Sequence, residues 1–361
     1  DAGFRANTRQ AVQAVALPNT PVVSGRYNGV LGHGAAVSAI LHGALQVKAR
    51  TIIILDGSTR SITPEWIPAL ATLVLNRQAD LVKPRYDHPL PDGGVNDLLY
   101  FPFTRAMWGV SLRHPTATDY AISAKLARAV LAHDVWQTEV NRFGFDIWLA
   151  TVAITDGWRL AQAALGSKQT VRQPSGTRGL TIFKESIGTM LRQVYVRQKC
   201  RPAAGQIRST PVFTRFAPQG NLSLTPPNDC TGYIESLALG WMEYRSLWKR
   251  VMLPETLAVV EHLASLPVEQ FYFPPNLWAK IAYDFAVVYN KGERDPDTIA
   301  IALYPLYLGR LASFWSEVAG LTAVGRAGTV AAQAAEFEAL LPYFEYRWKT
   351  YLPWVDSGEK R

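Results

Sequence analysis

An aspartate directly after an apolar run is the first candidate in this sequence for a residue of a functional site. Residues 52–55, Ile-Ile-Ile-Leu, end at Asp56, which is the pattern of a strand buried on both faces of a parallel sheet. Open α/β sheets bind ligands just beyond the carboxyl ends of their strands, so Asp56 stands where such a site would be. Its carboxylate would either contact a ligand or cap the turn that follows.

A short glycine motif, Gly32-His33-Gly34, precedes residues 37–47, which have the apolar spacing of a helix. Glycines before a helix let backbone N–H groups approach an anion at the positive end of the helix dipole. A lone G-x-G is weakly specific, so the motif indicates either an anion-binding turn or a simple tight turn.

Two further acids, Asp119 and Asp146, lie at the starts of expected elements. Asp119 ends a turn before a short strand that reaches Ser123, and Asp146 precedes an apolar helix over 147–154. Asp119 would orient a hydroxyl group or act as a base, or else form an Asx turn. Asp146 would contact a substrate, or else cap its helix.

The elements around these residues alternate between helix and strand. After the strand that ends before Asp56 we expect a helix over 67–75, capped by Ser61 or Thr63 and with Pro64 in its first turn. This alternation predicts a doubly wound α/β domain. Further expected elements are a strand over 80–83, a loop over 84–97, a helix over 96–108, a helix over 125–133 and a strand over 158–165.

The last third of the sequence is nearly all helical in pattern. Tryptophans and tyrosines recur there at helical spacing, which is typical of core contacts between helices rather than of a binding site. Near the start of the chain we expect one more helix and a short strand. The expected C-terminal helices are 234–252, 254–265, 276–289, 298–318 and 329–352, and the early elements are 7–15 and 21–23.

The composition is that of an ordinary globular protein. The chain has 361 residues, of which 48% are hydrophobic and 18% charged, and no apolar run approaches the ~20 residues needed to cross a bilayer. Cys200 and Cys230 permit one disulfide and fit no metal spacing, so we expect a reducing compartment, the cytoplasm. The chain opens on Asp1 without a signal-peptide pattern, so we expect it to be trimmed or to lack an N-terminal portion.

The net charge of +8 comes from one stretch of the sequence. Between Lys168 and Arg215 there are ten basic residues and one acid, Glu185. This stretch predicts either an anionic partner, such as a nucleotide, a lipid surface or another protein, or a solvated basic loop and helix. We expect no nucleic acid as partner, because no nucleic-acid-binding motif accompanies the stretch.

Taken together, these motifs resemble nucleotide-sugar glycosyltransferases of the GT-A fold, in the family-2-like group that includes mannosylglycerate and glucosylglycerate synthases. The order and spacing of the motifs carry the resemblance, which spans most of the chain and implies a first strand before Asp1. The corresponding stretches are the one that begins at Asp1, Gly32-His33-Gly34, Asp56-Gly57-Ser58, Pro64-Glu65-Trp66, Ala117-Thr118-Asp119 and Gly144-Phe145-Asp146.

The resemblance implies a donor site, an acceptor site and catalytic acids. The catalytic residues would be Asp119 and Asp146. The guanidinium groups of Arg85 and Arg105 would form bidentate hydrogen bonds with an acceptor carboxylate such as that of glycerate. Otherwise they would be ordinary surface charges. The residues implied for the nucleotide sugar are Asp1, Gly32, His33, Gly34, Asp56, Gly57 and Ser58.

The resemblance also implies a divalent metal, Mg²⁺ or Mn²⁺, held by two acids and a histidine against the donor diphosphate. Asp56 matches the first acid, but Ser58 and Thr170 stand where the second acid and the histidine are expected. We therefore expect weakened metal binding at Asp56. The basic stretch is an alternative source of positive charge for the diphosphate.

These expectations divide the chain into a GT-A-like α/β domain over 1–167, a basic connecting segment over 168–232 and an α-helical region over 233–361. The expected function is transfer of a hexose from a nucleotide sugar to a small hydroxylated acceptor such as a glycerate-like acid. The alternative is a glycosyltransferase-like protein that has lost its chemistry and serves as a structural or interaction subunit.

Overall fold

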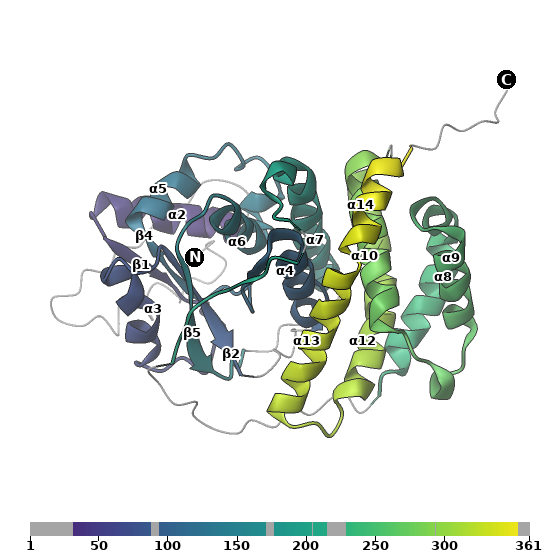
Figure 1. The fold of residues 1–361 in the computed structure, drawn as a ribbon. Coiled ribbons are helices and arrows are strands. Elements are labelled where there is room, and N and C mark those ends of the chain that lie inside the picture. Colours follow the sequence, from purple (N-terminus) through teal and green to yellow (C-terminus); the bar gives the residue numbers. More distant parts are fainter. Residues whose placement is uncertain are drawn as a thin grey trace.

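The computed structural model describes residues 32–87, 94–170, 177–203, 205–214, 229–292 and 294–352. The helix expected over 7–15 and the strand expected over 21–23 lie outside these residues. In Figure 1 an α/β part, drawn from purple to teal, lies beside a group of helices in green and yellow. The expected combination of an α/β part and a helical C-terminal region is confirmed.

Among the described residues, the α/β part is built on a five-stranded sheet in the order β1-β4-β2-β5-β7. β4 is antiparallel to both of its neighbours, whereas β2, β5 and β7 are parallel to one another. Four strands therefore run in one direction, and the carboxyl ends of β1, β2 and β5 meet the start of β4 at one edge. The strands are β1 (Thr51–Ile54), β2 (Leu81–Tyr86), β4 (Tyr120–Ser123), β5 (Leu160–Gly166) and β7 (Val212–Phe213).

Helices cover both faces of this sheet (Figure 1). On one face α3 packs against Val82 and Ala121. On the other face α2, α5 and α6 pack against Ile54 and Ile122. Neighbouring residues of β4 thus point to opposite faces, as strand geometry requires. The four helices are α2 (His33–Gln46), α3 (Trp66–Leu75), α5 (Ala124–Leu131) and α6 (Phe145–Thr155).

Several boundaries in the α/β part differ from the expected ones by a few residues, and two of the predictions are wrong. The prediction that Ser61 or Thr63 caps α3 is wrong, because the helix begins at Trp66 without a side-chain cap. The Ser61 hydroxyl instead accepts a hydrogen bond from the backbone N–H of Gln169, at 3.0 Å. The prediction of a loop over 84–97 is also wrong for its first residues, because β2 continues to Tyr86 along β5.

Short elements complete this part of the molecule. The helix expected over 96–108 consists of a π-helical turn, η1, that runs directly into α4. A two-residue strand, β3, pairs in parallel with β6. These elements are η1 (Asn96–Tyr100), α4 (Phe101–Trp108), β3 (Val110–Ser111), η2 (Glu139–Asn141) and β6 (Arg208–Ser209).

The basic stretch builds part of the fold. It contains α7 (Thr177–Val196), η3 (Gln198–Cys200) and both β6 and β7, so the boundary expected after residue 167 falls inside the sheet-forming part. Several of its basic side chains form ion pairs with acids elsewhere in the chain, which neutralises much of the local charge. These pairs are Lys184–Asp297, Arg192–Glu139, Arg197–Asp156 and Arg201–Glu345.

Two of the expected C-terminal helices are each divided in two. The breaks fall at Leu303 and Leu340, because Pro305 and Pro342 lie in the first turns of α12 and α14, where proline cannot continue a preceding helix. The helical region comprises α8 (Thr231–Val251), α9 (Pro254–Ser265), η4 (Val268–Gln270), α10 (Pro275–Lys291), α11 (Pro296–Ala302), α12 (Tyr304–Val318), α13 (Ala323–Ala339) and α14 (Leu341–Thr350).

One apolar core joins the helical region to the α/β part. The ring of Phe103 on α4 lies 6.3 Å from that of Phe337 on α13, and both belong to the largest buried cluster. The indole Nε1–H of Trp278 on α10 donates to the backbone carbonyl of Leu98, at 2.7 Å. The two parts therefore share buried surface.

Two further properties concern membranes and thiols. No helix among the described residues combines the length and apolar character that crossing a bilayer requires. Cys200 and Cys230 are both free thiols.

Candidate active site at the carboxyl edge of the sheet

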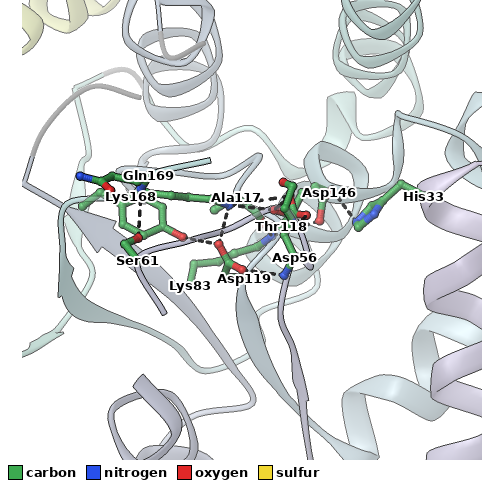
Figure 2. Close-up of polar contacts among 12 residues, drawn as sticks. His33, Asp56, Ser61, Lys83, Ala117, Thr118, Asp119, Asp146, Lys168 and Gln169 are labelled. Carbon is green, nitrogen blue, oxygen red and sulfur yellow. Dashed lines mark hydrogen bonds and ion pairs between the residues drawn. The ribbon is translucent and has the colours of Figure 1, made fainter. Parts of the chain in front are cut away.

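Asp119 lies at the centre of the polar residues that meet at this edge (Figure 2). Its side chain is completely buried at the start of β4. Oδ1 accepts the backbone N–H of Asp56 at 2.8 Å, and Oδ2 accepts the Tyr86 hydroxyl at 2.6 Å and the Lys168 ammonium at 2.5 Å. Asp119 therefore joins three strand ends, and the expected alternative of a local Asx turn does not describe it.

Asp56 lies at the outer side of this group, with 31% of its side chain exposed. Oδ1 accepts the backbone N–H of Ser58 at 2.9 Å, and Oδ2 accepts the Thr118 hydroxyl at 3.2 Å. Partial burial raises the pKa of Asp56, but these hydrogen bonds and the Lys168 ammonium outweigh burial and hold the pKa below its ordinary value. Asp56 thus caps its turn with one oxygen, and its carboxylate stays partly exposed.

Lys168 reaches Asp119 from the segment that follows β5. The backbone N–H of Arg60 donates to the Gln169 carbonyl at 2.7 Å, and Thr59 pairs with Thr170 in an isolated antiparallel bridge. These contacts tie the segment to the loop after β1 on the C-terminal side of Lys168. The lysine side chain is 5% exposed, so its ammonium is held inside the site.

Asp146 forms a second group with His33 and Lys83 (Figure 2). It lies in the first turn of α6, whose N-cap is Gly144, so the expected alternative that Asp146 caps the helix is wrong. Oδ2 is 3.1 Å from Nε2 of His33, and Oδ1 is 3.7 Å from Nζ of Lys83. Lys83 also donates to the Ala117 carbonyl at 2.7 Å, which links this group to the turn that carries Asp119.

Burial and charge shift the pKa values of both bases in this second group. Burial lowers the pKa of Lys83 to about 8, although the Asp146 and Asp119 carboxylates oppose it. Burial also lowers the pKa of His33, but the neighbouring Asp146 carboxylate outweighs it and raises the pKa above the ordinary 6.5. His33 therefore holds its proton to a higher pH than a free imidazole does.

Together the two groups form what we call the charge network, which contains three carboxylates and three basic side chains. The buried polar atoms here that have no hydrogen-bond partner in the part of the chain that the structure describes include Nε2 of His33, Oδ1 of Asp146 and the Tyr120 hydroxyl. The first two lie in the ion pairs given above. Such atoms call for an explanation, because buried polar groups are normally hydrogen-bonded. The network consists of His33, Asp56, Lys83, Asp119, Asp146 and Lys168.

The glycines of the Gly32-His33-Gly34 motif have a packing role. A Cβ on Gly34 would lie 2.0 Å from the Val140 carbonyl oxygen, and one on Gly32 would lie 2.6 Å from Cα of Arg142. The Gly34 N–H already donates to the Arg142 carbonyl at 2.8 Å. The motif therefore lets α2 approach η2 closely, and this contact sets the position of His33.

The other predicted site residues lie apart from these contacts or outside the described residues. Arg85 is exposed on β2, and Gly57 is exposed in the turn after Asp56. Arg105 on α4 forms an ion pair with Glu338 of α13, at 2.8 Å, which gives it a role in helix packing. Asp1 lies outside the described residues.

Sequence reasoning missed Lys83, Tyr86 and Lys168 as site residues. Lys168 follows the end of β5 just as Asp56 follows β1, so the same strand-end rule would have indicated it. Lys83 stands in a strand with helices on both faces, where a charge must be paired. Tyr86 carries no such signal, because its partner Asp119 is distant in sequence.

The residues present do not fit a divalent metal. Both oxygens of Asp119 already accept hydrogen bonds, and the Lys168 ammonium lies 2.5 Å from Asp119 Oδ2 and 3.9 Å from Asp56 Oδ2, where it would repel a second cation. Ser58 contributes a backbone N–H to Asp56 instead of a carboxylate. Among the described residues no group of three or more acids, histidines and cysteines is arranged to hold a metal ion.

Comparison with known proteins adds no relative: no protein-family model matches this chain, and no curated protein shows significant similarity to it.

Proposed function

We propose that this protein is a glycosyltransferase with a GT-A-like α/β part, which transfers a hexose from a nucleotide sugar to a small hydroxylated acceptor such as a glycerate-like acid. One observation carries the proposal: the charge network joins acids and bases from separate parts of the chain at one edge of the sheet (Figure 2). The edge formed by the carboxyl ends of strands is where open α/β sheets bind ligands.

Asp56 and His33 are the members of the charge network that a ligand would reach. Their side chains are 31% and 26% exposed, whereas the other four members are at most 8% exposed. His33 is the first residue of α2, so an anion beside it also meets the positive end of the helix dipole. A diphosphate suits the His33 side of this pair, and a sugar hydroxyl suits the Asp56 carboxylate, which would repel a phosphate.

The proposed reaction is a group transfer to a hydroxyl. The acceptor oxygen attacks the anomeric carbon of the hexose, the bond from this carbon to the diphosphate oxygen breaks, and the diphosphate leaves with the electron pair. The hydroxyl proton passes to neutral His33, which Asp146 orients from 3.1 Å. Asp119 is a positioning residue in this proposal, because hydrogen bonds occupy both of its oxygens.

An assay of diphosphate release tests this function. The protein is incubated with UDP- and GDP-linked hexoses together with glycerate, and nucleoside diphosphate and hexosylated product are measured. We expect His33→Gln to lower the rate by about 10²- to 10⁴-fold, as loss of a general base does. Asp297→Asn, at the half-exposed ion pair with Lys184, is the matched control and keeps the rate. Absence of release from every donor by the folded protein, with and without Mn²⁺, would exclude the proposal.

The alternative, a glycosyltransferase-like protein without chemistry, is favoured by one observation: Asp119 and Lys83 are completely buried and paired, as in a structural ion network. Ser58→Asp combined with Thr170→His distinguishes the two. If the unaltered protein is inactive and the double variant gains transfer activity, the protein is a decayed enzyme. If neither is active, a structural role is supported.

A further inference from the structure

The position between Asp56 and Asp119 holds a cation that belongs to the chain itself. Nζ of Lys168 lies 2.5 Å from Oδ2 of Asp119, 3.9 Å from Oδ2 of Asp56 and 3.1 Å from the Thr118 hydroxyl oxygen. Figure 2 shows the lysine side chain extended toward this group of oxygens. Two carboxylates and a hydroxyl are also the ligand types that hard divalent cations take.

We propose that the Lys168 ammonium occupies the place of a divalent metal, so that ligand binding at this site is independent of metal and removal of the lysine creates a divalent-cation site. The claim that Lys168 occupies the place of a metal, the cation statement, depends only on the distances given above. The statement about ligand binding rests on the proposed function.

Burial explains why a cation is required here. Asp119 is completely shielded from solvent, and an unpaired carboxylate in such a place is strongly unfavourable. The ammonium compensates this charge and at the same time donates to Thr118, whose hydroxyl in turn donates to Asp56. One lysine therefore satisfies the two acids that a metal would otherwise bridge.

The backbone fixes the lysine in this place. The two residues that follow it, Gln169 and Thr170, are bound to the loop after β1 by hydrogen bonds to Arg60 and Ser61 and by the bridge to Thr59. The ammonium is thus a fixed part of the site, in contrast to a metal ion, which exchanges with solvent.

Removal of the side chain leaves the oxygens in place. In Lys168→Ala the Oδ2 atoms of Asp56 and Asp119 and the Thr118 hydroxyl would surround the vacated position with two negative charges. Mg²⁺ or Mn²⁺ would then compensate these charges, because oxygen ligands of this kind suit both ions. In the unaltered protein the Lys168 ammonium fills this position.

Manganese binding to the full chain tests the cation statement. Unaltered protein, Lys168→Ala and Lys184→Ala are titrated with Mn²⁺ by calorimetry, and their thermal unfolding is measured in EDTA and in about 5 mM Mn²⁺. Lys184→Ala removes a lysine from a half-exposed ion pair and serves as the control. We expect Mn²⁺ to bind and to raise the Tm by about 2 °C or more only in Lys168→Ala.

Two results would overturn the cation statement. The first is saturable Mn²⁺ binding by the unaltered protein. The second is a folded Lys168→Ala variant that does not respond to Mn²⁺. If Lys168→Ala fails to fold, Lys168→Gln takes its place, and the titration of the unaltered protein still decides the first point.

Nucleoside diphosphate binding by the unaltered protein separates the inference from the function. Equal affinity for UDP or GDP in EDTA and in Mn²⁺ supports both. Binding in Mn²⁺ alone overturns the metal independence and leaves the proposed function standing. Absence of binding in both conditions overturns the proposed function and the statement on ligand binding, while the Mn²⁺ titrations continue to decide the cation statement.

Discussion

At the scale of single residues, the charge network depends on pairing. Its buried acids are stable because each faces a base: Asp119 faces Lys168, and Asp146 faces His33 and Lys83. Removing one partner of a buried pair leaves an uncompensated charge, which costs more than the pair itself contributes. The network therefore makes the stability of the protein sensitive to single substitutions among its members.

Asp119→Asn tests this sensitivity. We expect it to lower the free energy of unfolding by about 3–5 kcal/mol, because the Lys168 ammonium stays buried without its counter-charge. Urea denaturation measures the change. Asp297→Asn removes the acid of the half-exposed Lys184 pair and should cost less than about 1 kcal/mol. Equal costs for the two variants would contradict the account.

The stability should also depend on pH through His33. Its pKa is higher in the folded protein than the ordinary 6.5 of the unfolded chain, so the folded state binds this proton more tightly. The stabilisation is complete below pH 6.5 and is lost as the pH rises through the folded-state pKa. Denaturant unfolding of the unaltered protein and His33→Gln from acidic to mildly alkaline pH measures it, and the difference in stability between them should shrink with rising pH. A constant difference would speak against the ion pair.

The acids of the site were predictable from the sequence, but most of their contacts were not. Asp56 and Asp146 stand beside clear strand and helix patterns, which mark their positions locally. Tyr86 and Asp119 meet only in the folded sheet, and no local pattern encodes that contact. Arg105 was predicted as a site residue, but in the folded protein it forms an ion pair with Glu338, which is distant in sequence.

At the scale of elements, the contact between α2 and η2 positions His33. Gly34→Ala should destabilise the protein by about 1–3 kcal/mol or more, because its Cβ would meet the backbone of Val140 and the helix would have to shift. Gly43 lies in the same helix with open space around it, so Gly43→Ala should be neutral or stabilising by up to about 1 kcal/mol.

Thermal and urea unfolding of the two alanine variants compare them directly. A shift of α2 should also change the environment of His33, which NMR of the imidazole signals detects in Gly34→Ala and not in Gly43→Ala. Equal stability of the two variants would show that the close approach of α2 to η2 is unimportant.

Element types followed from periodicity more reliably than element ends did. The apolar spacing predicted the helix that became α9 with its actual bounds, 254–265. Periodicity alone did not divide the helices at Leu303 and Leu340, although Pro305 and Pro342 were local signals of a break. The strands β6 and β7 have only two residues each, which is too short for a recognisable alternation of apolar and polar residues. They form because they pair with β3 and β5 in the folded protein.

At the scale of the whole molecule, the shared core predicts a single cooperative unit. Residues of η1 and α4 from the α/β part and of α10 and α13 from the helical region belong to one buried cluster. We therefore expect one calorimetric unfolding transition. Trp278→Phe, which removes the hydrogen bond to Leu98, should lower that transition without splitting it. Two separate transitions in the unaltered protein would contradict the shared core.

The central claim is that the charge network binds a nucleotide sugar through its diphosphate, with Lys168 in place of a metal. Calorimetric titration of the unaltered protein with UDP and GDP, in EDTA and again in Mn²⁺, tests it most directly. The account predicts saturable binding of one of the two nucleotides with the same affinity in both conditions. Absence of binding heat for both nucleotides in both conditions would contradict it.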